Sequence, residues 1–175
     1  MNHTLIFIVT PQEQPAPAVV RLSVAGLIWS ESRKKVPRVP SWSKFMYYFA
    51  YASNLSKKRM RERCPDSKPC FVAVLPNHKM VFTGWSREWR GGKATLKSYQ
   101  GEKVRGAIYE VTEACLRRLD KYEPGYTRLN VTVFDEDNQA IPAVTYLKSG
   151  QLDETLPSKE YGEVIRQGYR DWHIA

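Results

Sequence analysis

A chain of 175 residues with 42% hydrophobic and 12% aromatic residues is long enough for one globular domain and too short for two full ones. No run of 18 or more apolar residues is present, which argues against a membrane-spanning helix and predicts a soluble protein. The formal net charge of +9 is divided between 6 basic and 2 acidic residues in positions 1–45 and 21 basic and 16 acidic residues after them, so the later part is only mildly basic.

The first 45 residues differ in composition from the rest. An apolar stretch, Leu5–Val9, is followed by a cluster of prolines, without helix or strand periodicity. A secretory signal would begin with a basic segment, but His3 is the only residue of basic character before this stretch, which argues against such a signal. We interpret residues 1–45 as a disordered leader or a wrongly extended start, and residues 46–175 as the folded domain.

The domain opens with a strand and a short helix. Tyr47–Tyr51 is predicted to be a buried strand, and it runs into the polar turn Ala52–Asn54. Ser56–Arg63 is predicted to form one or two basic helical turns.

The middle of the chain predicts antiparallel strands. Two polar turns, Pro76–His78 and Gln100–Glu102, each separate a pair of apolar runs. The predicted strands are Cys70–Leu75, Lys79–Phe82, Ala94–Ser98 and Val104–Tyr109. Arg87–Lys93, which mixes basic and aromatic residues, is predicted to be a glycine turn between strands rather than a nucleic-acid-binding motif.

The last part predicts two helices and two strands. Thr112–Tyr122 has an N-cap residue and an apolar stripe, and Lys159–Tyr169 is the final helix. Leu129–Phe134 and Ala143–Leu147 are the strands between them. The sequence therefore predicts a mixed α/β (α+β) fold, in which a small, curled, largely antiparallel, barrel-like sheet is flanked by two or three helices.

The cysteines and histidines carry no recognisable site. Cys64, Cys70 and Cys115 form neither a CxxC pair nor a zinc-ligand pattern, and their odd number argues against a disulfide framework, so we expect reduced cysteines and a cytoplasmic protein. The histidines are scattered along the chain, which gives no support to a metal site or a Ser/His triad.

Two local features have a chemical interpretation as well as a structural one. The amides of Ala52–Leu55 would suit a carboxylate or an oxyanion, but the segment also fits an ordinary capped turn. Glu123 ends a helix beside Tyr122 and Tyr126, where desolvation would suit it to proton transfer, but it also fits a solvated glutamate at a turn. Asp120 is interpreted as structural.

Several motifs in register resemble the γ-glutamylcyclotransferase family. Tyr48–Leu55 reads YFAYASNL, similar to that family's YFAYGSNL loop. Trp89–Thr95, Val104–Tyr109 and Leu119–Glu123 resemble its W-x-G-G-x-A-T, V-x-G-x-x-Y/W and L-D-x-x-E motifs. The resemblance covers residues 46–175 and none of 1–45, and Ser53-Asn54 favours this branch over relatives specific for glutathione or γ-glutamylamines.

The resemblance implies a cyclotransferase that converts a γ-glutamyl amino acid or a related small γ-glutamyl compound into 5-oxoproline and releases an amine. It implies Glu123 as the catalytic acid/base, and no metal or organic cofactor. The residues that it implies for substrate binding are Tyr48, Phe49, Ala50, Tyr51, Ala52, Ser53, Tyr126, Tyr146 and Tyr161. A small-molecule substrate is the expected partner, with a homodimer as a further expectation and no nucleic acid or membrane.

Two departures from the family pattern leave an alternative open. Ala52 replaces the loop glycine, which would be costly if the backbone there needs a positive φ or if this residue lies against the ligand, and Pro124 replaces the glycine after Glu123. The alternatives are therefore an inactive family member that binds a metabolite or protein, and a cyclotransferase for γ-glutamylamines or glutathione.

Overall fold

The computed structural model describes residues 45–150 and 153–174. Its elements in chain order are β1 (Phe45–Ala50), the 3-10 helix η1 (Ser53–Leu55), α1 (Lys57–Arg63), β2 (Lys68–Ser86), β3 (Gly91–Thr112), α2 (Glu113–Tyr122), β4 (Tyr126–Phe134), β5 (Ala140–Lys148) and α3 (Lys159–Asp171). The predicted leader, residues 1–45, lies outside the described residues except for Phe45, the first residue of β1.

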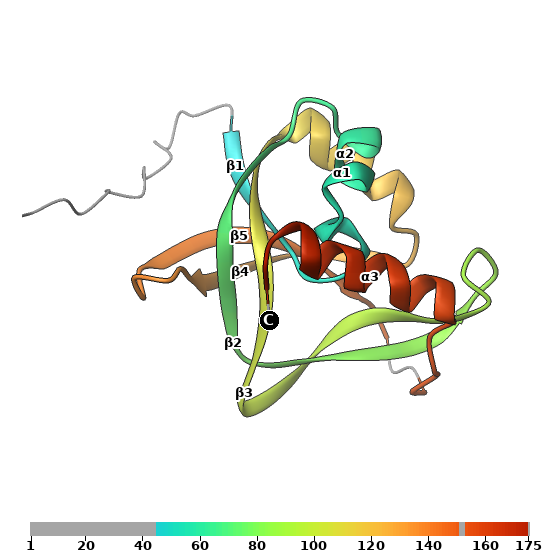
Figure 1. The fold of residues 1–175 in the computed structure, drawn as a ribbon. Coiled ribbons are helices and arrows are strands. Elements are labelled where there is room, and N and C mark those ends of the chain that lie inside the picture. The colour runs from blue at the N-terminus through green and yellow to red at the C-terminus, as the bar shows by residue number, and fades with distance from the viewer. Residues whose placement is uncertain (1–44, 151–152, 175) are drawn as a thin grey trace, which may run out of the picture. The chain divides into compact units, whose positions relative to one another are not determined.

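The strands close into a barrel in the order β1-β3-β2-β4-β5. Each neighbouring pair is antiparallel except β1 and β5, which meet in parallel at Tyr48 and Val144 and so close the barrel. Figure 1 shows β2 and β3 running side by side around it. This architecture confirms the predicted α+β class and the predicted curled sheet with a few flanking helices.

The prediction of four separate strands in the middle of the chain was wrong, because the two polar turns lie inside two long strands. Pro76 of β2 pairs with Lys103, but His78 pairs with Ser98, so residues 99–102 of β3 bulge out opposite Asn77. Asn77 and Gly101 both have positive φ, and the Gly101 N–H donates to Asn77 Oδ1 over 3.1 Å. The turn residues Asn77 and Gly101 therefore mark a β-bulge within the continuous pairing of β2 and β3.

Helix α2 packs on the barrel as its apolar stripe predicts. Thr112 is the N-cap, and its hydroxyl accepts a hydrogen bond from the Cys115 N–H over 3.1 Å. Cys115, Leu116 and Leu119 are buried in the main apolar core. Within the described ranges, no helix is both long and apolar enough to cross a lipid bilayer.

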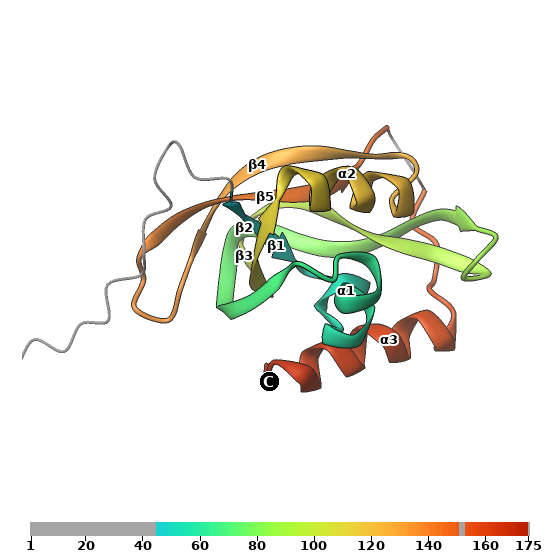
Figure 2. The same ribbon diagram turned by 90° about the horizontal axis from the view of Figure 1, so that it is seen from above.

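Helix α3 fixes the turn that follows β1. A Cβ atom on Gly168 would lie 2.4 Å from the Leu55 Cβ, so only glycine allows this close approach. The Leu55 carbonyl accepts hydrogen bonds from Trp172 Nε1 over 2.9 Å and from the Tyr109 hydroxyl over 3.1 Å. Figure 2 shows α3 running alongside α1 below the strands. The backbone around η1 is therefore held by the last helix of the chain.

A disulfide joins α2 to the end of α1. Cys64, which directly follows α1, is bonded to Cys115 of α2, and their Cα atoms are 5.4 Å apart. The expectation that the cysteines are reduced was therefore wrong for this pair, because folding brings together two positions that are 51 residues apart. Cys70 is unpaired and exposed.

Candidate functional site

Glu123 lies at the C-terminal end of α2, where the chain leaves the helix. It is the C-cap residue, with φ −118° and ψ 55°, and Pro124 after it disfavours a further helical residue. Gly125 has a φ of +79°, a conformation that glycine adopts without steric cost, and turns the chain into β4. The result is a glutamate that is only 8% exposed at the end of a packed helix.

The Glu123 carboxylate has three side-chain partners from three different elements. Oε1 accepts hydrogen bonds from Arg63 Nη1 over 2.9 Å and from Asn54 Nδ2 over 3.2 Å. Oε2 accepts one from Lys93 Nζ over 3.1 Å. Two cations and one amide therefore surround this buried carboxylate and satisfy both of its oxygens.

Asn54 and Arg63 make a closed set of contacts on the Oε1 side. Arg63 Nη1 also donates to Asn54 Oδ1 over 2.9 Å, and Asn54 Nδ2 donates to the Tyr48 hydroxyl oxygen over 2.9 Å. The guanidinium carbon of Arg63 lies 4.6 Å from the centre of the Tyr122 ring. The four side chains that share these hydrogen bonds are all buried, and together they fix the orientation of the Glu123 carboxylate; they are Tyr48, Asn54, Arg63 and Glu123.

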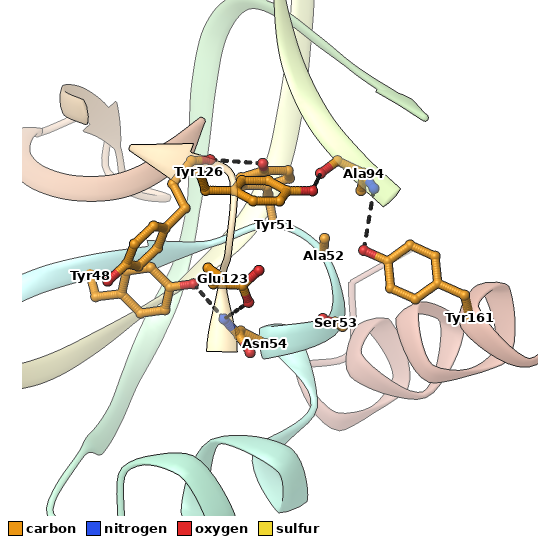
Figure 3. A pocket seen from close by; sticks show the side chains of 10 residues that line it. Tyr48, Tyr51, Ala52, Ser53, Asn54, Ala94, Glu123, Tyr126 and Tyr161 are labelled. Carbon is orange, nitrogen blue, oxygen red and sulfur yellow. Dashed lines mark hydrogen bonds between the residues drawn. The ribbon is translucent and has the colours of Figure 1, made fainter. Parts of the chain in front are cut away.

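A small cavity opens beside this carboxylate, and the volume in it that the centre of a water-sized sphere can occupy is about 20 Å³. Figure 3 shows Glu123 between Tyr48 and Asn54 on one side and Ala94 and Tyr161 on the other. The lining residues are Tyr48, Tyr51, Ala52, Ser53, Asn54, Ala94, Glu123, Tyr126, Tyr146 and Tyr161. The wall is aromatic, and Glu123 is the carboxylate among these residues.

The tyrosines of the wall are held by the backbone of the barrel. The Tyr126 hydroxyl donates to the Ala94 carbonyl over 2.7 Å, and the Tyr161 hydroxyl accepts from the Ala94 N–H over 3.3 Å. Burial, and then the charge of Glu123, raise the pKa of Tyr48 well above its usual value. Burial also raises the pKa of Tyr126, and that of Tyr161 to about 12. These phenols are therefore neutral near pH 7.

The structure brings most of the predicted site residues together around the cavity. Seven of the nine residues predicted to bind substrate line it, and so does the predicted acid/base, Glu123. Phe49 and Ala50 do not line the cavity, since both are fully buried in the barrel. Gly106 explains their position, because a Cβ there would lie 2.4 Å from the Ala50 carbonyl oxygen and 2.6 Å from the Phe49 ring.

The backbone at Ala52 does not require glycine. Ala52 is the N-cap of η1 and has a φ of −132°, which any residue adopts. Its carbonyl accepts a hydrogen bond from the Leu55 N–H over 2.8 Å, so the turn forms with alanine in place. The positive φ that would have made the substitution costly is therefore absent, although Ala52 does line the cavity.

Sequence reasoning missed four residues next to Glu123 or in the cavity wall. Asn54 and Ala94 lie inside the quoted motifs but were not assigned a role, and both line the cavity. Arg63 and Lys93 had no local signal, because a cation at the end of a basic helix or after two glycines is usually solvent-exposed. Only the tertiary contact with Glu123 identifies them.

Asp120, the other acid of the same motif, lies outside the cavity. Its carboxylate accepts hydrogen bonds from Arg128 Nη2 over 2.6 Å and from the Tyr146 hydroxyl over 2.7 Å. Arg128 is the first cause of its lowered pKa. Among residues 45–150 and 153–174, no group of three or more His, Cys, Asp or Glu side chains is arranged to hold a metal ion.

Comparison with known proteins gives a consistent result. The family model described as "Gamma-glutamyl cyclotransferase, AIG2-like" matches residues 48–172. The chain is similar to a gamma-glutamylcyclotransferase of Bos taurus, with 31% identity over 132 residues that cover 71% of this chain and 70% of that protein. The corresponding protein of Mus musculus is 30% identical over the same shares of the two chains.

A solved structure has the same arrangement of elements. It is described as a gamma-glutamyl cyclotransferase and superposes with a TM-score of 0.71 at 28% sequence identity. The match covers 74% of this chain and 81% of that one. The likeness therefore extends over most of both chains.

Proposed function

The chain belongs to the gamma-glutamyl cyclotransferase, AIG2-like family, and we propose that it is a gamma-glutamylcyclotransferase. The reaction is the intramolecular cyclisation of a γ-glutamyl amino acid, or a related small γ-glutamyl compound, to 5-oxoproline with release of the amine. The observation that carries this proposal is the buried, ion-paired carboxylate of Glu123 in the wall of an open cavity.

Ring closure needs a neutral amine close to a carbonyl carbon. The substrate's own α-amine is the nucleophile and its γ-carbonyl is the electrophile, so the task of the site is to fold the γ-glutamyl chain back on itself. The aromatic walls from Tyr48, Tyr126 and Tyr161 suit the apolar stem of that chain and exclude water from it.

Glu123 is the base in this mechanism and then the acid. Its carboxylate accepts the proton of the substrate's α-ammonium group, and the neutral amine attacks the γ-carbonyl carbon. The tetrahedral intermediate then expels the leaving amine, which takes up the proton from Glu123. The ring nitrogen passes its second proton to the released amine, so that the products are 5-oxoproline and an ammonium group. General acid–base transfer of this kind typically contributes about 10²–10⁴-fold to the rate.

Charge on the carbonyl oxygen and the α-carboxylate needs hydrogen-bond donors. The first N–H groups of η1, at Ser53 and Asn54, have no partner within that short helix. The phenol of Tyr161 accepts a hydrogen bond from the Ala94 N–H and keeps its own O–H as a neutral donor on the opposite wall. We assign anion binding to this loop and this hydroxyl, without a metal or organic cofactor.

The main alternative is an inactive family member that binds a metabolite or a protein. Ala52 is the best argument for it; its φ of −132° answers the part of that argument that concerns a positive φ, while Ala52 also lines the cavity. The retained, buried Glu123 is the best argument against it. The second alternative, a preference for γ-glutamylamines or glutathione, concerns the leaving group and needs a panel of substrates.

Three further expectations are part of the proposal. Residues 46–175 form the catalytic domain, which the family match over residues 48–172 supports. We also propose that the protein is cytoplasmic and acts in glutathione metabolism, although the Cys64–Cys115 disulfide is unusual for that compartment. Cell fractionation tests the location, and thiol labelling of Cys64 and Cys115 tests whether the disulfide forms there. A homodimer that binds no nucleic acid is expected, and light scattering with and without duplex DNA tests this expectation.

The test is 5-oxoproline release by the full chain from γ-glutamyl dipeptides, γ-glutamylamines and glutathione, with the Glu123→Gln variant alongside. Turnover of at least one dipeptide, reduced by about 10²–10⁴-fold or more in the variant, is the expected result. An unchanged thermal unfolding curve controls for folding. A well-folded wild type that releases no 5-oxoproline from any of these compounds refutes the proposal in favour of a binding role.

A further inference from the structure

Lys148 is a second cation, besides Lys93, that lies next to the cavity. It is the last residue of β5 and pairs with Tyr126 of β4, which lines the cavity. Its N–H group donates to Thr95 Oγ1 over 3.0 Å, and Thr95 follows Ala94, another lining residue. The backbone at Lys148 is therefore tied to two strands that contribute residues to the cavity wall.

The Lys148 ammonium group is held in place but has no acidic partner. It donates to the Thr83 carbonyl over 2.8 Å, and Thr83 is the cross-strand neighbour of Lys93. The Lys93 ammonium group contacts Glu123 Oε2 over 3.1 Å. Among the described residues, no carboxylate forms an ion pair with Lys148. Burial, and then the charge of Lys93, lower the pKa of Lys148, so this cation is short of a compensating negative charge.

A γ-glutamyl amino acid has a carboxylate that fits this position. Of its two carboxylates, the one on the γ-glutamyl side is assigned to the η1 loop and Tyr161, and the other belongs to the leaving amino acid. The leaving nitrogen takes up a proton from Glu123, so it comes within about 3 Å of that carboxylate. The carboxyl carbon of the leaving amino acid is about 2.5 Å from the same nitrogen. The second carboxylate therefore comes within reach of the lysines beside Glu123.

From this geometry we propose that Lys148, with Lys93 beside it, binds the carboxylate of the leaving amino acid and so determines which leaving groups the enzyme selects. The inference rests on the proposed function, since it assigns a subsite of the same reaction. An anion between the two lysines also offsets their mutual repulsion. A γ-glutamylamine has no carboxylate at this place, and in glutathione the corresponding carboxyl group is part of a peptide bond. Both compounds lack the group that Lys148 binds.

The other cations near Glu123 fit this role less well. Arg63 is 7% exposed, and its guanidinium group already donates to Asn54 and to Glu123. Lys93 is 13% exposed, and its contact with Glu123 makes it part of the proposed catalytic machinery. Replacing Lys148 removes a positive charge and leaves these hydrogen bonds to Glu123 in place. Lys148 is therefore the residue to vary.

The experiment compares kcat/KM for 5-oxoproline release by the full chain from γ-glutamyl-alanine and from γ-glutamyl-ethylamine. The two compounds differ only in the carboxylate of the leaving group. We expect the wild type to prefer γ-glutamyl-alanine. In Lys148→Met the ratio of the two kcat/KM values is expected to fall roughly tenfold to hundredfold, as for the loss of a hydrogen bond to a charged group. Lys148→Arg keeps the positive charge and is expected to retain the preference.

The matched control is Lys97→Met, which removes the same charge from a nearby surface. Lys97 lies on β3, and its side chain is 60% exposed and pairs with Glu154. This variant measures how much of the preference comes from long-range attraction of an anionic substrate. Its ratio is expected to equal that of the wild type. Thermal unfolding curves of all the variants control for folding.

Three outcomes overturn the inference while the wild type is active. In the first, Lys148→Met lowers kcat/KM by the same factor for both compounds, which shows a structural role or a contact with the carboxylate that both compounds share. In the second, the ratio does not change in Lys148→Met. In the third, Lys97→Met lowers the ratio as much as Lys148→Met does.

A wild type that releases no 5-oxoproline from either compound counts against the proposed function, and the inference is then tested by binding. The two compounds become stable ligands, and calorimetry measures their Kd values for the wild type and Lys148→Met. A tighter Kd for γ-glutamyl-alanine that Lys148→Met abolishes supports the inference. Equal Kd values for the two compounds, or no binding, overturn it.

Discussion

Two carboxylates three residues apart, Asp120 and Glu123, each pair with an arginine, yet they serve the molecule differently. The Asp120 side chain is 43% exposed, and its partner Arg128 is 29% exposed. The Glu123 side chain is 9% exposed, and its partner Arg63 is 7% exposed. The same type of ion pair, between a carboxylate and an arginine, is therefore solvent-accessible at Asp120 and buried at Glu123. The comparison teaches that burial, rather than pairing, distinguishes the carboxylate that we propose as the acid/base from the one that stays at the surface.

Breaking the two pairs is the strongest way to test this comparison. Arg63→Met removes one of the two cations that pair with the buried Glu123 carboxylate and leaves Asn54 Oδ1 without its donor, and is expected to lower the free energy of unfolding by about 3–5 kcal/mol. Arg128→Met, the matched control, is expected to cost less than about 1 kcal/mol, because water solvates the partners that it leaves. Urea unfolding followed by tryptophan fluorescence measures both. Equal costs would contradict the comparison.

The disulfide next to the buried site gives the second largest expected effect. It ties the end of α1, which carries Arg63, to α2, which ends at Glu123. The double variant Cys64→Ser with Cys115→Ser is expected to lower the free energy of unfolding by about 2–4 kcal/mol, since its unfolded chain is no longer cross-linked. Cys70→Ser should change nothing, because Cys70 is exposed and unpaired. A stability loss from Cys70→Ser alone would refute this assignment.

The smallest effect is expected at the exposed carboxylate and depends on pH. Hydrogen bonding from Arg128 lowers the pKa of Asp120 from its ordinary value of 3.8. A lowered pKa means that the stabilisation is fully present above that value and is lost as pH falls through the folded-state pKa. Asp120→Asn is therefore expected to cost less than about 1 kcal/mol at pH 7, and less still near pH 3. Urea unfolding at the two pH values measures the loss of unfolding free energy. A larger loss at the lower pH would contradict the predicted direction of the pH dependence.

The parts of the fold that depend on local pattern could be predicted from sequence. The helix over Thr112–Tyr122 has a cap residue and an apolar stripe, and the structure has both. The barrel follows from many short apolar runs separated by polar turns. The merging of strands into β2 could not be predicted, because Asn77 signals a sharp turn and a bulge in the same way.

The residues of the candidate site also fall into two groups: those that local sequence motifs predict and those that only tertiary contacts identify. Glu123 and most of the tyrosines were found through ordered motifs, which fix the identity of residues at given spacings. Arg63 and Lys93 could not be found, because each contacts Glu123 only after α1 and β3 pack around the end of α2. The Cys64–Cys115 pair was missed for the same reason, since spacing alone gives no connectivity.

The parallel contact between β1 and β5 has a consequence for how this protein is made. Tyr48 meets Val144, and the Thr145 hydroxyl donates to the Phe49 carbonyl across 96 positions of the chain. Contacts between residues so far apart close large loops and form slowly. During synthesis, β1 leaves the ribosome before its partner β5 has been made and cannot pair with it until then. The cavity is complete only after Tyr161 of α3 has also been made. A chain cut short before α3 therefore leaves the turn at η1 uncovered and the cavity incomplete, so we expect it to be degraded instead of yielding a partly active enzyme.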